Sequence, residues 1–288
     1  MEGCVVAAHG RQYVVELPDG GLLPCFPRGK RSDVACGDRV DIQRTSDDQG
    51  VIEAIQPRTS LLYRSNVVRQ KLIAANVDQI VIVVATEPGF SDELVTRALL
   101  AAESEEIEPL IVLNKCDLSE RVPAARAQLA VFAALGYRIV ELSARDHAED
   151  LRPELFGYTS VLVGQSGMGK STLVNALVPD AGAATREISA ALDSGKHTTT
   201  HATLYHLDAE SELIDSPGLQ EFGLGHLDRQ EIEHAFREFR PYLGQCRFRD
   251  CHHDREPDCA LTAAVAAGRI DPRRFTVYHR IIGTQRVD

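Results

Sequence analysis

Residues 161–173, VLVGQSGMGKSTL, decide the fold of this chain. An apolar strand leads into a loop that matches the pattern G-x-x-x-x-G-K-[ST], and an apolar helix follows it. The glycines let the backbone wrap its N–H groups around phosphate oxygens at the N-terminus of that helix. We therefore predict a phosphate loop whose nucleotide contacts come from Gly164, Gln165, Ser166, Gly167, Met168, Gly169, Lys170, Ser171 and Thr172.

The phosphate end of the site needs charges as well as backbone donors. Lys170 is expected to neutralise the β- and γ-phosphates during catalysis, and the Ser171 hydroxyl is expected to ligate Mg²⁺. Residues 215–218, DSPG, follow a short apolar strand and match D-x-x-G. We expect Asp215 to hold Mg²⁺ through water and the N–H of Gly218 to sense the γ-phosphate.

A threonine-rich segment, HTTT at residues 197–200, lies between these two motifs. It offers a further Mg²⁺ ligand, for which we favour Thr199 over Thr200, on a segment that could order and disorder with the γ-phosphate. Many GTPases carry a glutamine after D-x-x-G to orient water, but this chain has Leu219 there. Intrinsic hydrolysis should therefore be slow, and His197 is the best internal candidate to assist it, with a solvated loop histidine as the alternative.

Specificity for guanine is predicted by NKCD at residues 114–117, directly after a buried strand. In open α/β folds, ligands bind at the carboxyl ends of such strands. The Asp117 carboxylate can accept hydrogen bonds from guanine N1–H and N2–H₂, a donor pair that adenine lacks. We expect Asn114 to tether neighbouring loops and the base edge, and the Lys115 stem to stack over the ring.

The order of these motifs along the chain is permuted. Ser143 and Ala144, which follow the next strand and are expected to contact guanine O6 through backbone N–H groups, also precede the phosphate loop. A conventional GTPase runs phosphate loop, switch threonine, D-x-x-G, N-K-x-D and S-A. Cutting such a chain after D-x-x-G and joining its old ends leaves every strand and loop in place. The chain leaving Gly218 then feeds directly into the C-terminal region, so the nucleotide state could reorient that region.

The strand and helix pattern divides the 288 residues into three parts. Short apolar runs broken by turns over residues 4–55 predict a small five-stranded β-barrel, which we assign to an OB-fold RNA-binding domain at 1–60. Alternating apolar strands and helices predict a doubly wound parallel sheet for the GTPase domain at 61–225. Helices at about 229–240, 259–267 and 272–282 belong to a zinc-binding domain at 226–288.

Composition limits the partners and the compartment. The net charge is −11, but residues 61–225 carry 13 Lys+Arg against 23 Asp+Glu, whereas 226–288 carry 11 against 10. A local basic face on the flanks is therefore compatible with RNA, and a global electrostatic attraction is not. No run of eighteen apolar residues and no signal-like N-terminus is present. We expect a cytoplasmic protein with no membrane and no DNA partner, and a monomer.

A metal site is predicted near the C-terminus. Three thiols and one imidazole fall within fourteen residues as C-x4-C-x-H-x5-C, namely Cys246, Cys251, His253 and Cys259. Such a Cys₃His set is typical of a closed, structural Zn²⁺ site, and metal ligation fits a cytosolic protein better than a disulfide framework. The adjacent His252 is the alternative to His253, which we favour because its spacing fits a family pattern.

Taken together, these motifs resemble the RsgA (YjeQ) family of bacterial GTPases that depend on the small ribosomal subunit. The resemblance covers essentially the whole chain and includes the stretch K-x-x-A-A-N-x-D-Q from Lys71 to Gln79. It implies an N-terminal OB-fold, a permuted GTPase domain and a C-terminal zinc domain. It also implies hydrolysis of GTP to GDP stimulated by the 30S subunit, contact with 16S rRNA, a role in late 30S maturation, and His197 in catalysis.

Two other functions remain open at this point. A P-loop kinase acting on a small molecule would need a carboxylate base beside the γ-phosphate, and it would not need N-K-x-D. A zinc-containing RNA-binding protein with a vestigial nucleotide site is disfavoured because Lys170, Ser171 and Asp215 are intact. Turnover of GTP against ATP, with and without small subunits, separates the three.

Overall fold

The structure is a computed structural model that describes residues 1–29, 33–66, 69–182, 188, 202–216 and 223–285. Its N-terminal part is a β-barrel whose strands pair in the order β1-β2-β3-β5-β4 and close through β1–β4. These strands are β1 Glu2–His9, β2 Gln12–Glu16, β3 Leu22–Pro27, β4 Arg39–Arg44 and β5 Gly50–Ile55. The order, with β3 parallel to β5, is that of a five-stranded OB-type barrel, and the predicted strands are confirmed.

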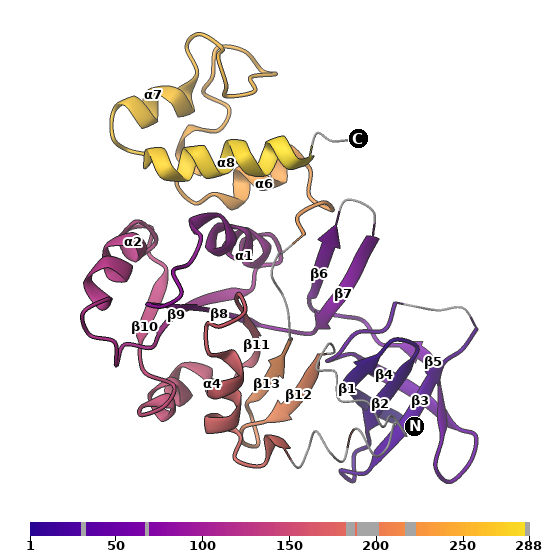
Figure 1. The fold of residues 1–288 in the computed structure, drawn as a ribbon. Helices are drawn as coiled ribbons and strands as arrows, with labels where there is room; N and C mark the ends of the chain where they lie inside the picture. The colour runs from indigo at the N-terminus through magenta and orange to yellow at the C-terminus, as the bar shows by residue number, and fades with distance from the viewer. Residues whose placement is uncertain (30–32, 67–68, 183–187, 189–201, 217–222, 286–288) are drawn as a thin grey trace.

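A parallel sheet forms the central part, in the order β10-β9-β8-β11-β13, with β12 antiparallel at its end. The central strands β8 and β9 are almost entirely apolar and buried, because helices cover both faces of the sheet there. The bounds are β8 Gln79–Ala85, β9 Glu108–Asn114, β10 Arg138–Glu141, β11 Thr159–Val163, β12 Thr203–His206 and β13 Glu212–Asp215. The predicted doubly wound sheet is therefore present (Figure 1).

Alternate side chains of the central strands enter two separate cores. Ile80, Ile82 and Val84 of β8 pack with α1 and α2, whereas Val81 and Val83 pack with α4 and α3 on the other face. This period of two is the reason that the sheet carries a helical layer on each side. The helices are α1 Asp92–Ser104, α2 Val122–Ala134, η1 Ala148–Leu151, α3 Arg152–Leu155 and α4 Lys170–Leu177.

A hairpin that the sequence analysis did not assign, β6 Leu61–Asn66 and β7 Arg69–Ala75, joins the barrel to the sheet. Asn76, just after it, donates to Gly37 O of the barrel at 2.9 Å and accepts from Thr59 N at 2.9 Å. Gly37 has no room for a side chain, because a Cβ there would lie 2.2 Å from Ala75 O. The A-A-N part of the K-x-x-A-A-N-x-D-Q stretch is thus a joint between barrel and sheet.

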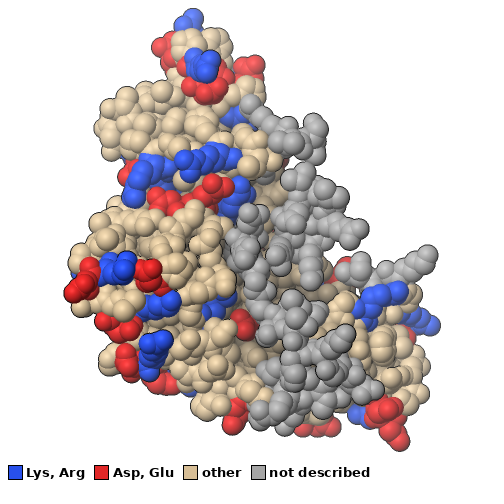
Figure 2. All heavy atoms as spheres, viewed as in Figure 1, with Lys and Arg blue, Asp and Glu red and all other residues tan. Residues whose placement is uncertain are grey.

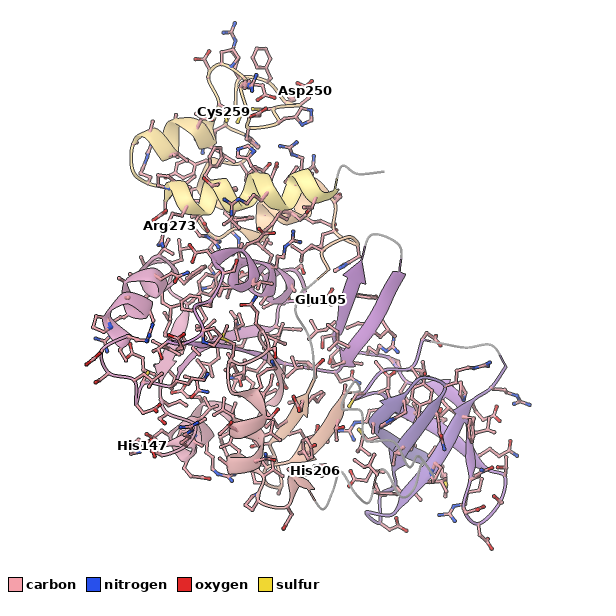
Figure 3. All side chains as sticks on the ribbon, in the orientation of Figure 1. Glu105, His147, His206, Asp250, Cys259 and Arg273 are labelled. Atoms are coloured by element: carbon pink, nitrogen blue, oxygen red, sulfur yellow. The ribbon has the colours of Figure 1, made fainter. Side chains whose placement is uncertain are left out.

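The barrel also touches the strand that follows the predicted switch segment. Ala7 of β1 pairs with Thr203 of β12, so the barrel and the central sheet form one continuous sheet. His206 of β12 lies 2.8 Å from the Glu16 carboxylate of β2, between sheet and barrel (Figure 3). The two domains predicted to meet near residue 60 are therefore also joined by backbone pairing between β1 and β12.

The C-terminal part is helical and stacks on α1 of the central domain (Figure 1). Its elements are α6 Arg229–Ala235, η2 Arg240–Tyr242, α7 Ala260–Ala266 and α8 Pro272–Gln285. The first helix is shorter than the predicted 229–240. The chain becomes extended at Phe236, where Phe236 and Phe239 stack at 4.5 Å between centroids and are fully buried with Tyr278. Burial of this pair outweighs continuation of the helix.

Candidate nucleotide and metal sites

A cleft of about 620 Å³ opens at the carboxyl ends of the parallel strands. Loops after β8, β9, β10, β11 and β13 meet there, which is where ligands bind in open α/β sheets. The lining residues are Glu87, Asn114, Lys115, Asp117, Leu118, Ser143, Ala144, Arg145, Ser166, Gly167, Gly169, Lys170, Ser171, Thr172 and Asp215. The base motifs and the phosphate motifs, far apart in sequence, therefore line one cleft.

Asn114 joins the base side of the cleft to the phosphate side. Its Nδ2 donates to Met168 O at 2.9 Å, and its Oδ1 accepts from Ala144 N at 2.8 Å and from Lys115 N at 2.7 Å. The side chain is only 1% exposed, so these bonds are screened from water. A single amide thus fixes N-K-x-D, S-A and the phosphate loop relative to one another.

All three glycines of the phosphate loop have a positive φ, and at two of them a side chain would also clash with its neighbours. At Gly164, φ is +147° and a Cβ would lie 2.2 Å from Val83 O. At Gly169, φ is +94° and a Cβ would lie 2.3 Å from the Nδ2 of Asn114. The loop therefore packs directly on the neighbouring strand and on Asn114, which explains glycine at both positions.

Lys170 and Asp215 face each other at the phosphate end. Nζ of Lys170 donates to the carbonyl oxygens of Gly164 and Gln165, the second at 2.9 Å. Burial lowers the pKa of Lys170 and raises the pKa of Asp215, and each charge opposes the shift of the other. A bound phosphate would add negative charge beside Lys170, and Mg²⁺ would add positive charge beside Asp215, which would further stabilise the charged forms of both groups.

The loop after β8 supports the base side, which the sequence analysis did not anticipate. Nζ of Lys115 donates to Glu87 O at 2.7 Å, and Thr86 Oγ1 donates to Lys115 O at 2.9 Å. The Glu87 carboxylate in turn pairs with Arg121 at 2.6 Å. These contacts hold the Lys115 stem along the wall of the cleft. No sequence motif marks Glu87. It reaches Lys115 because the strands that precede the two residues, β8 and β9, are neighbours in the sheet.

The metal-binding prediction concerns a second, separate place. The ligand atoms of Cys246, Cys251, His253 and Cys259 all lie within 4.8 Å of one another. Nδ1 of His253 is 3.3 Å from Cys259 Sγ and 3.5 Å from Cys246 Sγ, and the two sulfurs are 3.9 Å apart. In a tetrahedral zinc site the metal lies about 2.3 Å from each sulfur and about 2.0 Å from the nitrogen. The nitrogen then lies about 3.5 Å from each sulfur, and the sulfurs lie about 3.8 Å from one another. The separations among Cys246, His253 and Cys259 fit Zn²⁺, and Cys251 supplies a fourth ligand atom within 4.8 Å of the others.

The alternative ligand His252 points elsewhere. Its Nδ1 lies 2.6 Å from Nη1 of Arg229, and its ring is not among the clustered ligands.

Burial raises the pKa of the Cys259 thiol, but hydrogen bonds from Thr262 and His253 bring it down to about 7. A thiol near that value readily gives the thiolate that a metal needs.

Comparisons with known proteins agree with this arrangement. A model of the family described as RsgA GTPase matches residues 55–225. A small ribosomal subunit biogenesis GTPase RsgA of Burkholderia pseudomallei (strain 668) is 57% identical over 286 residues, covering 98% of this chain and 91% of the relative. The protein of that name from Bordetella pertussis is 56% identical, covering 98% and 95%.

The chain belongs to the RsgA GTPase family. It is therefore a GTP hydrolase, and the family implies GTP or GDP with Mg²⁺ in the cleft.

Two solved structures related to RsgA share the whole fold. YjeQ from Thermotoga maritima superposes with a TM-score of 0.76 at 31% identity, covering all of this chain and 99% of that one. YloQ, described as a circularly permuted GTPase, gives a TM-score of 0.70 at 27% identity, covering 99% and 94%. The permuted order inferred from the motifs is thus confirmed.

Ser143 and Ala144, which are predicted to contact guanine O6, already have hydrogen-bond partners within the protein. Ser143 Oγ donates to Asp146 at 2.9 Å, and the N–H of Ala144 already donates to Asn114, so a contact with guanine O6 would have to share that donor. Residues 197–201 and 217–222 lie outside the described part of the chain, so the roles of His197, Thr199 and Gly218 stay predictions.

Proposed function

We propose that this chain hydrolyses GTP during late maturation of the 30S subunit and that the subunit stimulates the hydrolysis. The name carried by its relatives, small ribosomal subunit biogenesis GTPase, supports the pathway. The observation that supports the nucleotide chemistry is the Asn114 tether, which joins the N-K-x-D loop, with the Asp117 carboxylate proposed to read guanine, to the phosphate loop in one cleft.

In the proposed reaction the residues of the chain bind and orient GTP. Asp117 accepts two hydrogen bonds from the base, and Lys170 exchanges its bonds to loop carbonyls for bonds to phosphate oxygens. Ser171 and Asp215 would hold Mg²⁺, and the ion would neutralise charge that develops on the phosphates. Because Leu219 cannot orient water, completion of the site falls to the subunit or to His197.

We further propose that the partner surface is 16S rRNA, reached through the barrel and the metal-binding region, in the cytoplasm and by a monomer. OB-type barrels bind oligonucleotides on their surfaces, and the Cys₃His cluster would be held rigid by one Zn²⁺. Among the described residues, none of the helices has the length and apolarity needed to cross a bilayer.

The function is tested by multiple-turnover hydrolysis of GTP and ATP, each with and without purified 30S subunits. We expect slow GTP turnover alone, a rise of at least about tenfold with 30S subunits, and little ATP turnover in either case. ATP turnover equal to that of GTP would contradict guanine selection. GTP turnover indifferent to 30S subunits would contradict the ribosomal role alone.

A separate experiment addresses His197. Single-turnover hydrolysis by His197→Ala on saturating 30S subunits should fall by about 10²-fold or more if His197 helps to position water. An unchanged rate, with GTP affinity also unchanged, would remove His197 from the mechanism and leave the subunit as the source of the missing group.

A further inference from the structure

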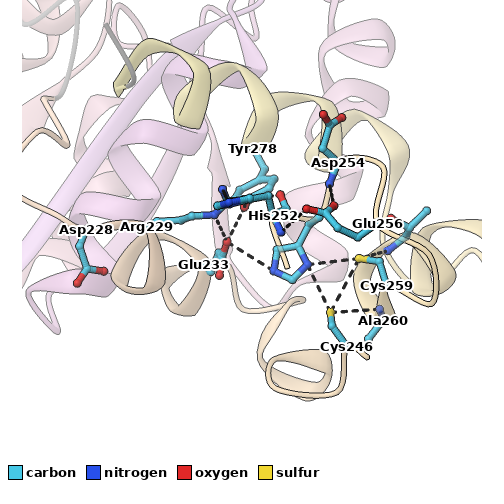
Figure 4. A network of polar contacts seen from close by, with 12 residues as sticks. Asp228, Arg229, Glu233, Cys246, His252, Asp254, Glu256, Cys259, Ala260 and Tyr278 are labelled. Atoms are coloured by element: carbon cyan, nitrogen blue, oxygen red, sulfur yellow. Dashed lines mark hydrogen bonds and ion pairs between the residues drawn. The ribbon is translucent and has the colours of Figure 1, made fainter. Parts of the chain in front are cut away.

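The imidazole of His253 has partners on both of its nitrogens. Nδ1 faces the thiols of Cys246 and Cys259, as described above, and Nε2 faces the carboxylate of Glu233 at 3.6 Å (Figure 4). The histidine is 5% exposed and the glutamate 7% exposed, so water does not compete for either group. The histidine comes from the cysteine-rich loop and the glutamate from α6, so folding rather than local sequence brings them together.

The Glu233 carboxylate is itself held in place from two other directions. Its Oε1 accepts from the Tyr278 hydroxyl of α8 at 2.5 Å and from Arg229 Nε, one turn earlier on α6, at 2.7 Å. A buried carboxylate normally destabilises the folded state unless such partners compensate it.

This arrangement matches what a histidine ligand requires. A metal-bound imidazole commonly donates its other ring N–H to a carboxylate, which fixes the tautomer and makes the ligand more basic. With Nδ1 turned to the sulfurs, Nε2 must carry the proton, and a shift of a few tenths of an ångström would bring that N–H into hydrogen-bond distance of Glu233.

We propose that Glu233 is the positioning residue of the zinc centre, which accepts the Nε2–H of His253 and locks that side chain as an Nδ1 ligand. The inference rests on the proposed Zn²⁺ site. Through Tyr278 and Arg229 the same carboxylate ties the metal to α8 and α6, the two helices that contact α1. The carboxylate therefore links the metal-binding loop to both of these helices.

The test compares the zinc affinity of full-length variants by competition with a chromogenic chelator at pH 7. Glu233→Gln keeps the size but removes the charge, and we expect zinc to bind about 10- to 100-fold more weakly. The matched control is Glu238→Gln, because Glu238 is also buried and paired, with Arg274 at 2.7 Å, but its described contacts do not reach the metal cluster. Its zinc affinity should stay within about twofold even though it unfolds more easily.

A second readout uses the zinc-loaded wild-type protein and does not depend on a variant folding. Long-range ¹H–¹⁵N NMR of labelled histidines should show His253 metal-bound at Nδ1 and protonated at Nε2. Metal at Nε2, or Glu233→Gln binding zinc as tightly as wild type, would overturn the role of Glu233. If the wild-type protein bound no zinc at all, both the proposed zinc site and the proposed role of Glu233 would be wrong.

Should Glu233→Gln not fold, Tyr278→Phe takes its place. It removes one hydrogen bond from the carboxylate and leaves Glu233 and His253 intact. We expect a smaller loss of zinc affinity, about fivefold. An affinity equal to that of the wild type would then count against the proposal.

Discussion

At the scale of single residues, Asn114 has the widest effect, because it bonds to three motifs at once. Asn114→Ala should weaken GDP and GTP binding alike, by about 10- to 100-fold, since the tether holds the cleft and does not touch the γ-phosphate. Fluorescence titration with labelled nucleotides measures both. Asn175→Ala, on an exposed position of α4, is the matched control and should change neither affinity. A loss confined to GTP would contradict a tethering role.

Asp117 is predicted to read the base through two hydrogen bonds. Asp117→Asn should weaken GTP binding by about 100-fold, because each hydrogen bond to a charged acceptor contributes about 1.5 kcal/mol or more to the binding free energy. Inosine triphosphate lacks the N2 amino group, so the same substitution should weaken the binding of that nucleotide less than it weakens the binding of GTP. Calorimetric titration of both nucleotides gives the comparison. Equal losses would show that Asp117 does not face N2.

Gly169 tests the packing of the phosphate loop. Gly169→Ala places a methyl group at a φ of +94° and 2.3 Å from Asn114, so we expect nucleotide binding to fall beyond detection and the melting temperature to drop. Gly89→Ala is a control from the neighbouring loop, where a Cβ would meet nothing within 4 Å. It should bind nucleotide normally. Normal binding by Gly169→Ala would contradict the close approach.

At the scale of elements, charged contacts dock the C-terminal helices on the GTPase domain. The Glu103 carboxylate at the end of α1 pairs with Arg240 at 2.7 Å and also contacts Arg237. Figure 2 shows Lys and Arg side chains beside Asp and Glu along this boundary, and Arg273 of α8 points toward it in Figure 3. Any reorientation of the C-terminal helices by the nucleotide would have to break these pairs.

A fully buried pair lies at the centre of the same contact. Arg274 of α8 bonds to Glu238 at 2.7 Å and to Thr96 of α1 at 2.6 Å. Arg274→Ala leaves the Glu238 charge buried and unpaired, so we expect a loss of about 3–5 kcal/mol in unfolding free energy by urea titration. The neighbouring Arg273 is half-exposed, so Arg273→Ala should lower the free energy of unfolding by no more than about 0.5 kcal/mol. Similar losses would contradict the special role of the buried pair.

At the scale of the whole molecule, the metal cluster and the nucleotide cleft have no residue in common. Removal of zinc by a strong chelator should abolish the near-ultraviolet circular dichroism of the buried Phe236, Phe239 and Tyr278 cluster. GDP affinity should change by less than about threefold, because the cleft belongs to other elements. A tenfold loss of GDP affinity would show that the two sites are coupled more tightly than their separation suggests.

Much of this molecule could be predicted from local patterns. The strands of the barrel and sheet follow from short apolar runs between turn residues, and the phosphate loop follows from its strand–loop–helix context. The metal cluster was found from spacing alone, although the choice between His252 and His253 needed a family pattern. The hairpin β6–β7 was missed, because its alternation is weak and its role is to join two domains.

By itself, the sequence determined which groups carry the chemistry, because loops such as 164–171 and 114–117 display their residues through local backbone geometry. Only the tertiary structure decided which distant groups meet. The bond from Asn114 to Met168, the support of Lys115 by Glu87 and the approach of Glu233 to His253 each join separate elements. Such contacts depend on strand order and helix packing, which no short stretch of sequence encodes.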